Sequence, residues 1–158
     1  MDQLVKKRVR QLLKELIQTD TTNELATEIE AARLLQAYFS ENGIQSEIVY
    51  SPKGRANLIA ILKGESETEP IVLLSHLDVV GPGEEEWEHP PFSGKVVDDV
   101  MWGRGTLDTK QLTAMHAGIL VELKKASVNA PLEKTVIFLT TADEENGSAE
   151  GMEFLAKQ

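Results

Sequence analysis

Apolar side chains near the N-terminus recur with a helical period. Across residues 4–17 they return every three or four positions, and Lys, Arg and Gln fill the other face. This spacing predicts an amphipathic helix packed on a core. A second helix is expected next, because Thr21 and Glu24 have the spacing of a capping box. Its apolar positions are Leu25, Ile29, Ala32, Leu35 and Phe39, and Gly43 is a suitable C-terminal stop.

The next segments have the composition of strands. Residues 44–50 and 57–62 predict two strands joined by a turn, and residues 95–97 and 100–102 predict a hairpin around Asp98 and Asp99. The charged residues 65–70 predict a surface loop, and the run Glu84–Glu86 predicts a solvated face.

The continuously apolar segment 71–74 predicts a strand that is buried on both faces, and the segment TVIFLTT at 135–141 predicts a second strongly buried strand. A helix is expected between them, from about Asp108 to Lys125, and another after Ser148. This alternation of helices and strands predicts an α/β sandwich with a largely parallel sheet.

Polar residues follow both apolar strands directly. His76 and Asp78 come after the first, and Glu144 and Glu145 come after the second. Ligand sites of open α/β sheets lie at the carboxyl ends of strands, so these side chains are expected at one edge. Residues two apart in a strand point to the same side, so Asp78 can orient the ring of His76 for a metal. The same pair can equally form a purely structural hydrogen bond.

The composition of the chain excludes some kinds of ligand and some kinds of metal site. The 158 residues contain 16 Lys and Arg against 26 Asp and Glu, for a formal net charge of −10, which argues against a nucleic-acid surface. There is no cysteine, so any metal must be held by His and carboxylate. For His89 and His116 we favour a structural role. With no apolar run of membrane-spanning length, we expect a cytoplasmic protein without a membrane partner.

Three stretches resemble the metal-site motifs of a known family: SHLDVV at 75–80, GRGTLDTK at 103–110 and TADEENGS at 141–148. The segment RANLIAILKG and the Trp87–Phe92 region fit the same pattern. The family is that of the co-catalytic zinc exopeptidases and N-deacylases, which includes aminoacylases, acetylornithine deacetylase, succinyl-diaminopimelate desuccinylase, glutamate carboxypeptidases and dipeptidases. The resemblance implies a three-layer α/β sandwich with a largely parallel central sheet, the phosphorylase/hydrolase-like catalytic domain of zinc peptidases, here truncated.

The resemblance also implies a role for each residue of the motifs. His76 would bind one metal ion, Asp78 would hold its ring, and Asp108 would bridge both ions. Glu144 would be the general base, and Glu145 would bind the other ion. The implied cofactors are two divalent metal ions, zinc first, with cobalt or manganese as alternatives.

Members of this family are considerably longer than this chain and have further ligands and a small inserted domain. Residues 1–158 are therefore expected to be the N-terminal part of the catalytic domain, without the small lid or dimerisation domain and without the C-terminal part. As given, they are expected to bind metal weakly or not at all and to be inactive. The full-length protein would be a metallopeptidase or deacylase, a homodimer acting on a small-molecule substrate, either a dipeptide or an N-acyl amino acid.

Three alternatives stay open. The chain can be a non-catalytic truncated module that binds a partner or weakly binds a cation. It can be a metal-free α/β protein in which His76, Asp108 and the glutamates form a hydrogen-bond network. It can also be an acid–base hydrolase that uses paired carboxylates, whose activity would survive chelation.

Overall fold

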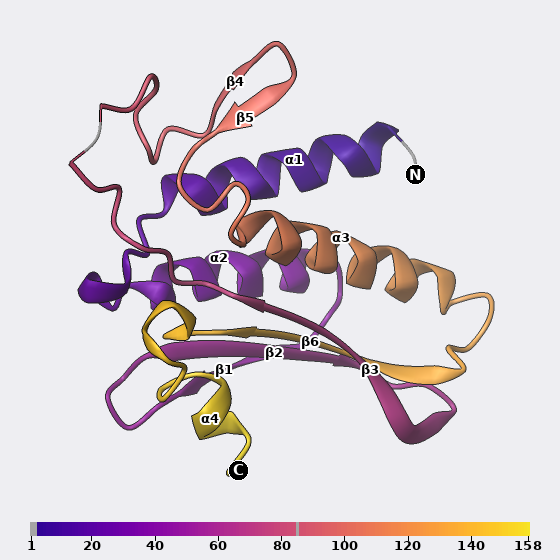
Figure 1. Cartoon of the computed structure of the whole chain (residues 1–158). Helices are drawn as coiled ribbons and strands as arrows, with labels where there is room; N and C mark the ends of the chain where they lie inside the picture. Colours follow the sequence, from indigo (N-terminus) through magenta and orange to yellow (C-terminus); the bar gives the residue numbers. More distant parts are fainter. Residues whose placement is uncertain (1–2, 85) are drawn as a thin grey trace.

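The computed structural model describes residues 3–84 and 86–158, apart from the side chain of Glu67. Figure 1 shows three long helices on one face of a twisted sheet, and a short helix on the other. The helices are α1 (Gln3–Gln18), α2 (Glu28–Glu41), α3 (Lys110–Ala126) and α4 (Met152–Leu155). The strands are β1 (Ser46–Tyr50), β2 (Ala56–Leu62), β3 (Ser66–His76), β4 (Lys95–Val97), β5 (Val100–Trp102) and β6 (Lys134–Thr141). Two 3₁₀ turns, η1 (Asn23–Leu25) and η2 (Glu144–Asn146), complete the order.

The main sheet has the strand order β1-β2-β6-β3, and β4 and β5 form a separate hairpin. Only β3 and β6 are parallel, with Leu73 opposite Phe138; β1–β2 and β2–β6 are antiparallel. The α/β class is confirmed, but within the described residues the sheet is mixed rather than largely parallel. The reason is local: the short turn from Ser51 to Arg55 returns the chain beside β1 and forces an antiparallel pair.

The core lies between the sheet and the three long helices. Leu16 of α1, Phe39 of α2 and Leu120 of α3 are fully buried against Leu58 of β2 and Phe138 of β6. The rings of Phe39 and Phe138 meet edge to face with centroids 4.9 Å apart. The predicted amphipathic helix is confirmed, and Gly43 follows α2 in the left-handed conformation, with φ 68°.

The capping-box prediction is wrong. Helix α2 begins at Glu28, and Leu25 is 56% exposed in the turn before it. Thr21 does not cap a helix; its hydroxyl donates to the backbone oxygen of Leu77 at 2.6 Å. The backbone here pairs with Val79 instead, through bonds of 2.9 and 3.1 Å. Tertiary pairing with the segment after β3 therefore overrides the local signal.

Two predictions about β3 are also wrong. The expected loop at 65–70 belongs largely to the strand, which starts at Ser66 and changes register before Ile71. The expected burial on both faces is absent, since Ile71, Val72 and Leu74 are 50%, 49% and 45% exposed. In the described part of the chain, β3 is an edge strand, and of its residues 71–74 Leu73 is the one that packs against the core cluster.

The remaining surface predictions are mostly confirmed. Asp98 and Asp99 turn the β4–β5 hairpin with positive φ, as expected for its two-residue loop. Glu84 and Glu86 are exposed, whereas Glu85 lies outside the described residues. The helix expected after Ser148 is only the short α4. Among the described helices, none has the length and hydropathy needed to span a membrane.

Candidate metal centre

His76 ends β3 at the carboxyl edge of the sheet and is 7% exposed. Its Nδ1 lies 2.9 Å from the backbone oxygen of Asp78 and 3.6 Å from the Asp78 carboxylate. The predicted contact with Asp78 is present, although the shorter distance is to the backbone. Nε2 lies 3.1 Å from the carboxylate of Asp108, so the ring is oriented with this nitrogen toward the acidic groups.

The carboxylate of Asp78 is fully buried and organises the residues around it. It accepts hydrogen bonds from the Asn23 side chain at 2.6 Å and from the N–H groups of Glu144 and Glu145, both at 3.1 Å. Burial by itself raises the pKa of Asp78, but the hydrogen bonds from His76, Asn23 and the two N–H groups outweigh it and lower the pKa. Asp78 therefore stays ionised and fixes the backbone of both glutamates.

The two glutamates follow β6 in a segment that we call the glutamate loop, residues 142–151. One ligand atom from each of His76, Glu144 and Glu145 lies within 4.8 Å of the others. Glu144 is 3.6 Å from Nε2 of His76, and its side chain is 52% exposed. The pKa of Glu145 is raised, first by burial and further by the neighbouring carboxylates of Asp108, Asp78 and Glu144, against the opposing effect of His76.

Asp108 lies in a second segment, the aspartate loop, residues 103–109, which leads into α3. Its side chain is 77% exposed and touches the site through His76. Gly105 holds this loop against the protein: its φ is +88°, and a Cβ there would lie 3.0 Å from Lys110 and 3.1 Å from Val79. Because it has no Cβ, glycine allows the loop backbone to lie this close to Lys110 and Val79.

The neighbouring carboxylates of Asp78 and Asp108 determine the charge state of His76. Burial lowers its pKa, but hydrogen bonds to Asp78 and Asp108 prevail and raise it to about 9. A divalent cation that binds His76 would therefore displace the proton that its ring carries among these carboxylates. One imidazole with its Nδ1 held by an acceptor, together with Asp108, Glu144 and Glu145, is a donor set that suits zinc or a similar ion. The residues therefore fit the metal site that their sequence pattern implies.

The other two histidines lie away from this group. His89 has its Nδ1 3.4 Å from the Lys95 ammonium, and its ring packs edge to face on Trp102. His116 is inside α3, where burial lowers its pKa and its Nδ1 has no hydrogen-bond partner. Within the described residues, neither shares a candidate metal group.

Several residues at the site were not identified by sequence reasoning. Asn23 belongs to the segment that separates the two predicted helices and was given no role, whereas its side chain donates to the Asp78 carboxylate. Arg55 and Asn57 hold the glutamate loop through contacts between distant parts of the chain, and Asp143 is the loop residue that Arg55 bonds. The only signal for Arg55 and Asn57 is that they belong to the segment RANLIAILKG, and that signal assigns them no role.

Known proteins resemble this chain in sequence and in fold. The model of peptidase family M20/M25/M40 matches residues 72–158. A probable succinyl-diaminopimelate desuccinylase from Staphylococcus aureus is 36% identical over 148 residues, which are 92% of this chain and 34% of that protein.

Solved structures show the same fold. An M20 family metallo-carboxypeptidase from Sulfolobus solfataricus superposes with a TM-score of 0.77 at 21% identity, covering 95% of this chain and 33% of that one. The Bacillus subtilis YXEP protein, described as a dinuclear metal binding peptidase, gives a TM-score of 0.70 at 23% identity over 99% of this chain and 40% of that one. The chain thus spans 33–40% of the length of these proteins.

Proposed function

Since the chain belongs to peptidase family M20/M25/M40, we propose that it forms the N-terminal part of the catalytic domain of a metal-dependent amide hydrolase. The observation that carries this proposal is the convergence of His76, Glu144 and Glu145 within 4.8 Å, with Asp108 on the same imidazole nitrogen. These residues come from three separate segments of the chain, and β3 and β6 bring them to one edge of the sheet.

Each residue has a proposed role toward two divalent metal ions, zinc first, with cobalt or manganese as alternatives. His76 would hold one ion and Glu145 the other, Asp108 would be shared by both, and Asp78 would hold the His76 ring. When bound, such a pair of ions polarises the scissile carbonyl and lowers the pKa of the attacking water. Two features of this chain support these roles: its side chains include metal-binding groups, and the imidazole of His76 is buried and already oriented.

Glu144 is the proposed general base. Its side chain is half exposed and lies beside His76, so it can reach a water molecule at the edge of the site. Its carboxylate takes a proton from that water and returns it to the leaving amine, a role that contributes about 10²–10⁴-fold to a hydrolytic rate. The hydrogen bond from the backbone N–H of Glu144 to the Asp78 carboxylate holds the loop backbone in place during both proton transfers.

The substrate class that we propose is an amide next to a carboxylate, either an N-acyl amino acid or a dipeptide. The Staphylococcus aureus relative is named for the first, and the Sulfolobus solfataricus structure is called a carboxypeptidase. We further propose that residues 1–158 alone hydrolyse little. His76, Asp108 and Glu145 give each ion two protein ligands, whereas hydrolytic zinc sites normally have three.

The test uses the protein expressed from its complete reading frame. We expect two equivalents of zinc by elemental analysis and hydrolysis of N-succinyl amino acids, N-acetyl amino acids or dipeptides. Glu144→Gln should keep the metal and lose about 10²–10⁴-fold in kcat. Glu47→Gln, at an exposed position on β1, is the matched control and should change neither. A protein that takes up no metal, or whose hydrolysis survives chelation, would refute the proposal.

A second candidate is a non-catalytic module that binds a partner protein. The half-exposed Ile71, Val72 and Leu74 on the edge strand favour it, because an open apolar strand edge is a pairing surface. The elemental analysis separates the two, since the module would bind no stoichiometric metal.

A further inference from the structure

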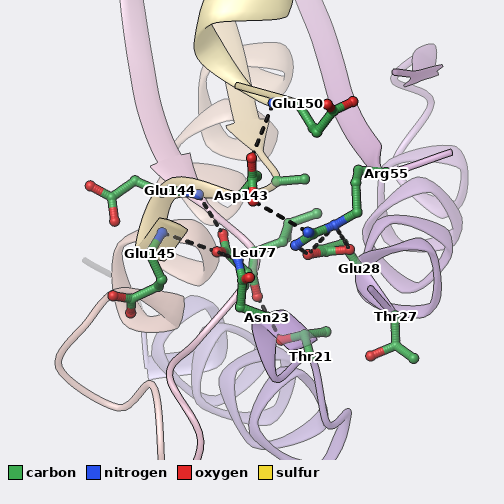
Figure 2. Close-up of polar contacts among 12 residues, drawn as sticks. Thr21, Asn23, Thr27, Glu28, Arg55, Leu77, Asp143, Glu144, Glu145 and Glu150 are labelled. Atoms are coloured by element: carbon green, nitrogen blue, oxygen red, sulfur yellow. Dashed lines mark hydrogen bonds and ion pairs between the residues drawn. The ribbon is translucent and has the colours of Figure 1, made fainter. Parts of the chain in front are cut away.

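A buried ionic network lies directly behind the glutamate loop (Figure 2). Glu28 is fully buried at the start of α2, and Arg55 is 8% exposed just before β2. The Arg55 Nε lies 3.0 and 2.9 Å from the two carboxylate oxygens of Glu28, and Nη2 donates to the same carboxylate. On its other side, Arg55 Nη1 donates to the Asp143 carboxylate at 3.3 Å.

Asp143 closes the glutamate loop on itself. It has a left-handed backbone with φ 64°, which Asp tolerates better than most residues. Its second carboxylate oxygen accepts the N–H of Glu150 at 3.2 Å, and its backbone oxygen accepts the N–H of Ser148 at 2.6 Å. Arg55 therefore holds the residue that determines the course of residues 143–150.

Asn57 provides a second attachment from the same part of β2. Its side-chain oxygen accepts the N–H of Ala142 at 2.9 Å, and its amide donates to the backbone oxygen of Glu150 at 3.1 Å. Both ends of the glutamate loop are thus bonded to the side chain of Asn57. A loop fixed at both ends leaves its middle residues, Glu144 and Glu145, little freedom to move.

The network and the glutamate carboxylates lie on opposite sides of Asp143. In Figure 2 the side chains of Glu144 and Glu145 point away from Arg55. One ligand atom of each lies within 4.8 Å of a ring nitrogen of His76. Their N–H groups bond to Asp78. Arg55 therefore acts on the two glutamates through Asp143 and the loop backbone, and makes no direct bond to their carboxylates among the described contacts.

Stability alone is a weak reason for such a network. Burying an ion costs several kcal/mol, and a well-packed apolar group of similar size is often as stable as a buried ion pair. Placing Glu28, Arg55 and Asp143 behind the site has a clearer consequence for geometry, because charged hydrogen bonds restrict both distance and direction.

We propose that Arg55, held by Glu28, is a positioning residue that fixes Asp143 and so sets the placement of Glu144 and Glu145 beside His76. Its significance for metal binding rests on the proposed function, whereas the positioning itself requires no metal. The outer partners of metal ligands change metal affinity by about 10–100-fold when they are removed, which is the effect expected here.

The experiment compares Arg55→Met with Arg33→Met in the protein expressed from its complete reading frame. Arg33 is the matched control, since it forms an exposed ion pair with Glu30 on α2 at 3.3 Å. The first readout is amide hydrogen exchange at Glu144, Glu145 and Glu150, relative to the β2–β6 ladder. The second is cobalt(II) affinity, followed by visible absorption.

We expect Arg55→Met to speed exchange at the three loop amides by about tenfold or more beyond any change in the ladder. Cobalt affinity should fall about 10–100-fold. Arg33→Met should change neither quantity. Uniform acceleration of all amides with unchanged cobalt affinity would overturn the proposal, because it would show a role in stability only.

Asp143→Asn keeps the proposal testable if Arg55→Met does not fold. It leaves the Glu28–Arg55 pair in place and turns one oxygen of Asp143 into an NH2 group, which weakens the bond to Arg55 or the bond from the N–H of Glu150. The amides of Glu144 and Glu145 are therefore the informative ones in this variant. The same local exchange and weaker cobalt binding are expected, and unchanged values would overturn the proposal. If the unmutated protein binds no cobalt, the proposed function fails, while the exchange at the loop amides still decides whether Arg55 positions the glutamates.

Discussion

The two loops that supply carboxylates to the site are held in different ways. The glutamate loop is bonded at several points to buried groups outside it: Asp78, Asn57 and Arg55. The aspartate loop carries Asp108 with its side chain 77% exposed, beside Leu107, which is 83% exposed. One side of the site is therefore built into the core before any cation binds, while Asp108 is free to adjust to what occupies the site.

The largest expected difference concerns stability. Asp78→Asn turns one of two accepting oxygens into an NH2 donor, so the N–H of either Glu144 or Glu145 loses its buried acceptor. The substitution should lower the free energy of unfolding by about 3 kcal/mol. Asp108→Asn, at an exposed position, should lower it by less than about 1 kcal/mol. Urea denaturation measures both. Equal losses would show that the two loops are held alike.

The next effect concerns pH at His76, where the two loops meet. Its pKa of about 9 lies above the ordinary 6.5, so below pH 9 a cation must displace a proton. Zinc affinity should therefore rise about tenfold per pH unit between roughly pH 6 and 8 and level off above 9. Competition with a chromophoric chelator measures it. In Asp108→Asn the plateau should begin at lower pH, because one bond that raises the pKa is weakened.

The same shift has a consequence for the metal-free protein. Because the folded-state pKa of His76 is raised from 6.5 to about 9, its stabilising contribution is complete below 6.5 and is lost as the pH rises through 9. For the zinc measurement above, an affinity that does not change between roughly pH 6 and 8 would contradict the charge state that we assign to His76.

The smallest effect tests the packing of the glutamate loop. A Cβ at Gly151 would lie 1.9 Å from the backbone oxygen of Ala142, so Gly151→Ala should cost about 2 kcal/mol through overpacking. Gly147 has φ +97° and open space around it, so Gly147→Ala should cost about 1 kcal/mol, from backbone strain alone. Thermal unfolding of the two variants gives their order; the reverse order would mean that the loop end is loosely packed.

The sequence by itself determined the elements and the chemical character of the site. The period of residues 4–17 specified α1, the apolar run 135–141 specified β6, and polar residues after the strands marked the edge where His76, Glu144 and Glu145 meet. These features are local, because each depends on neighbours within a few positions along the chain.

Only the tertiary structure decided the strand order, the exposure of β3, the start of α2 and the support behind the glutamates. A hydrophobic pattern says which side chains avoid water, but not which distant segment covers them, and so the edge position of β3 was not foreseen. Arg55 bonds Glu28, which is 27 positions away in the sequence, and Asp143, which is 88 positions away. A bond between charged residues so far apart has no local signature, and it forms only because the fold removes water from all three.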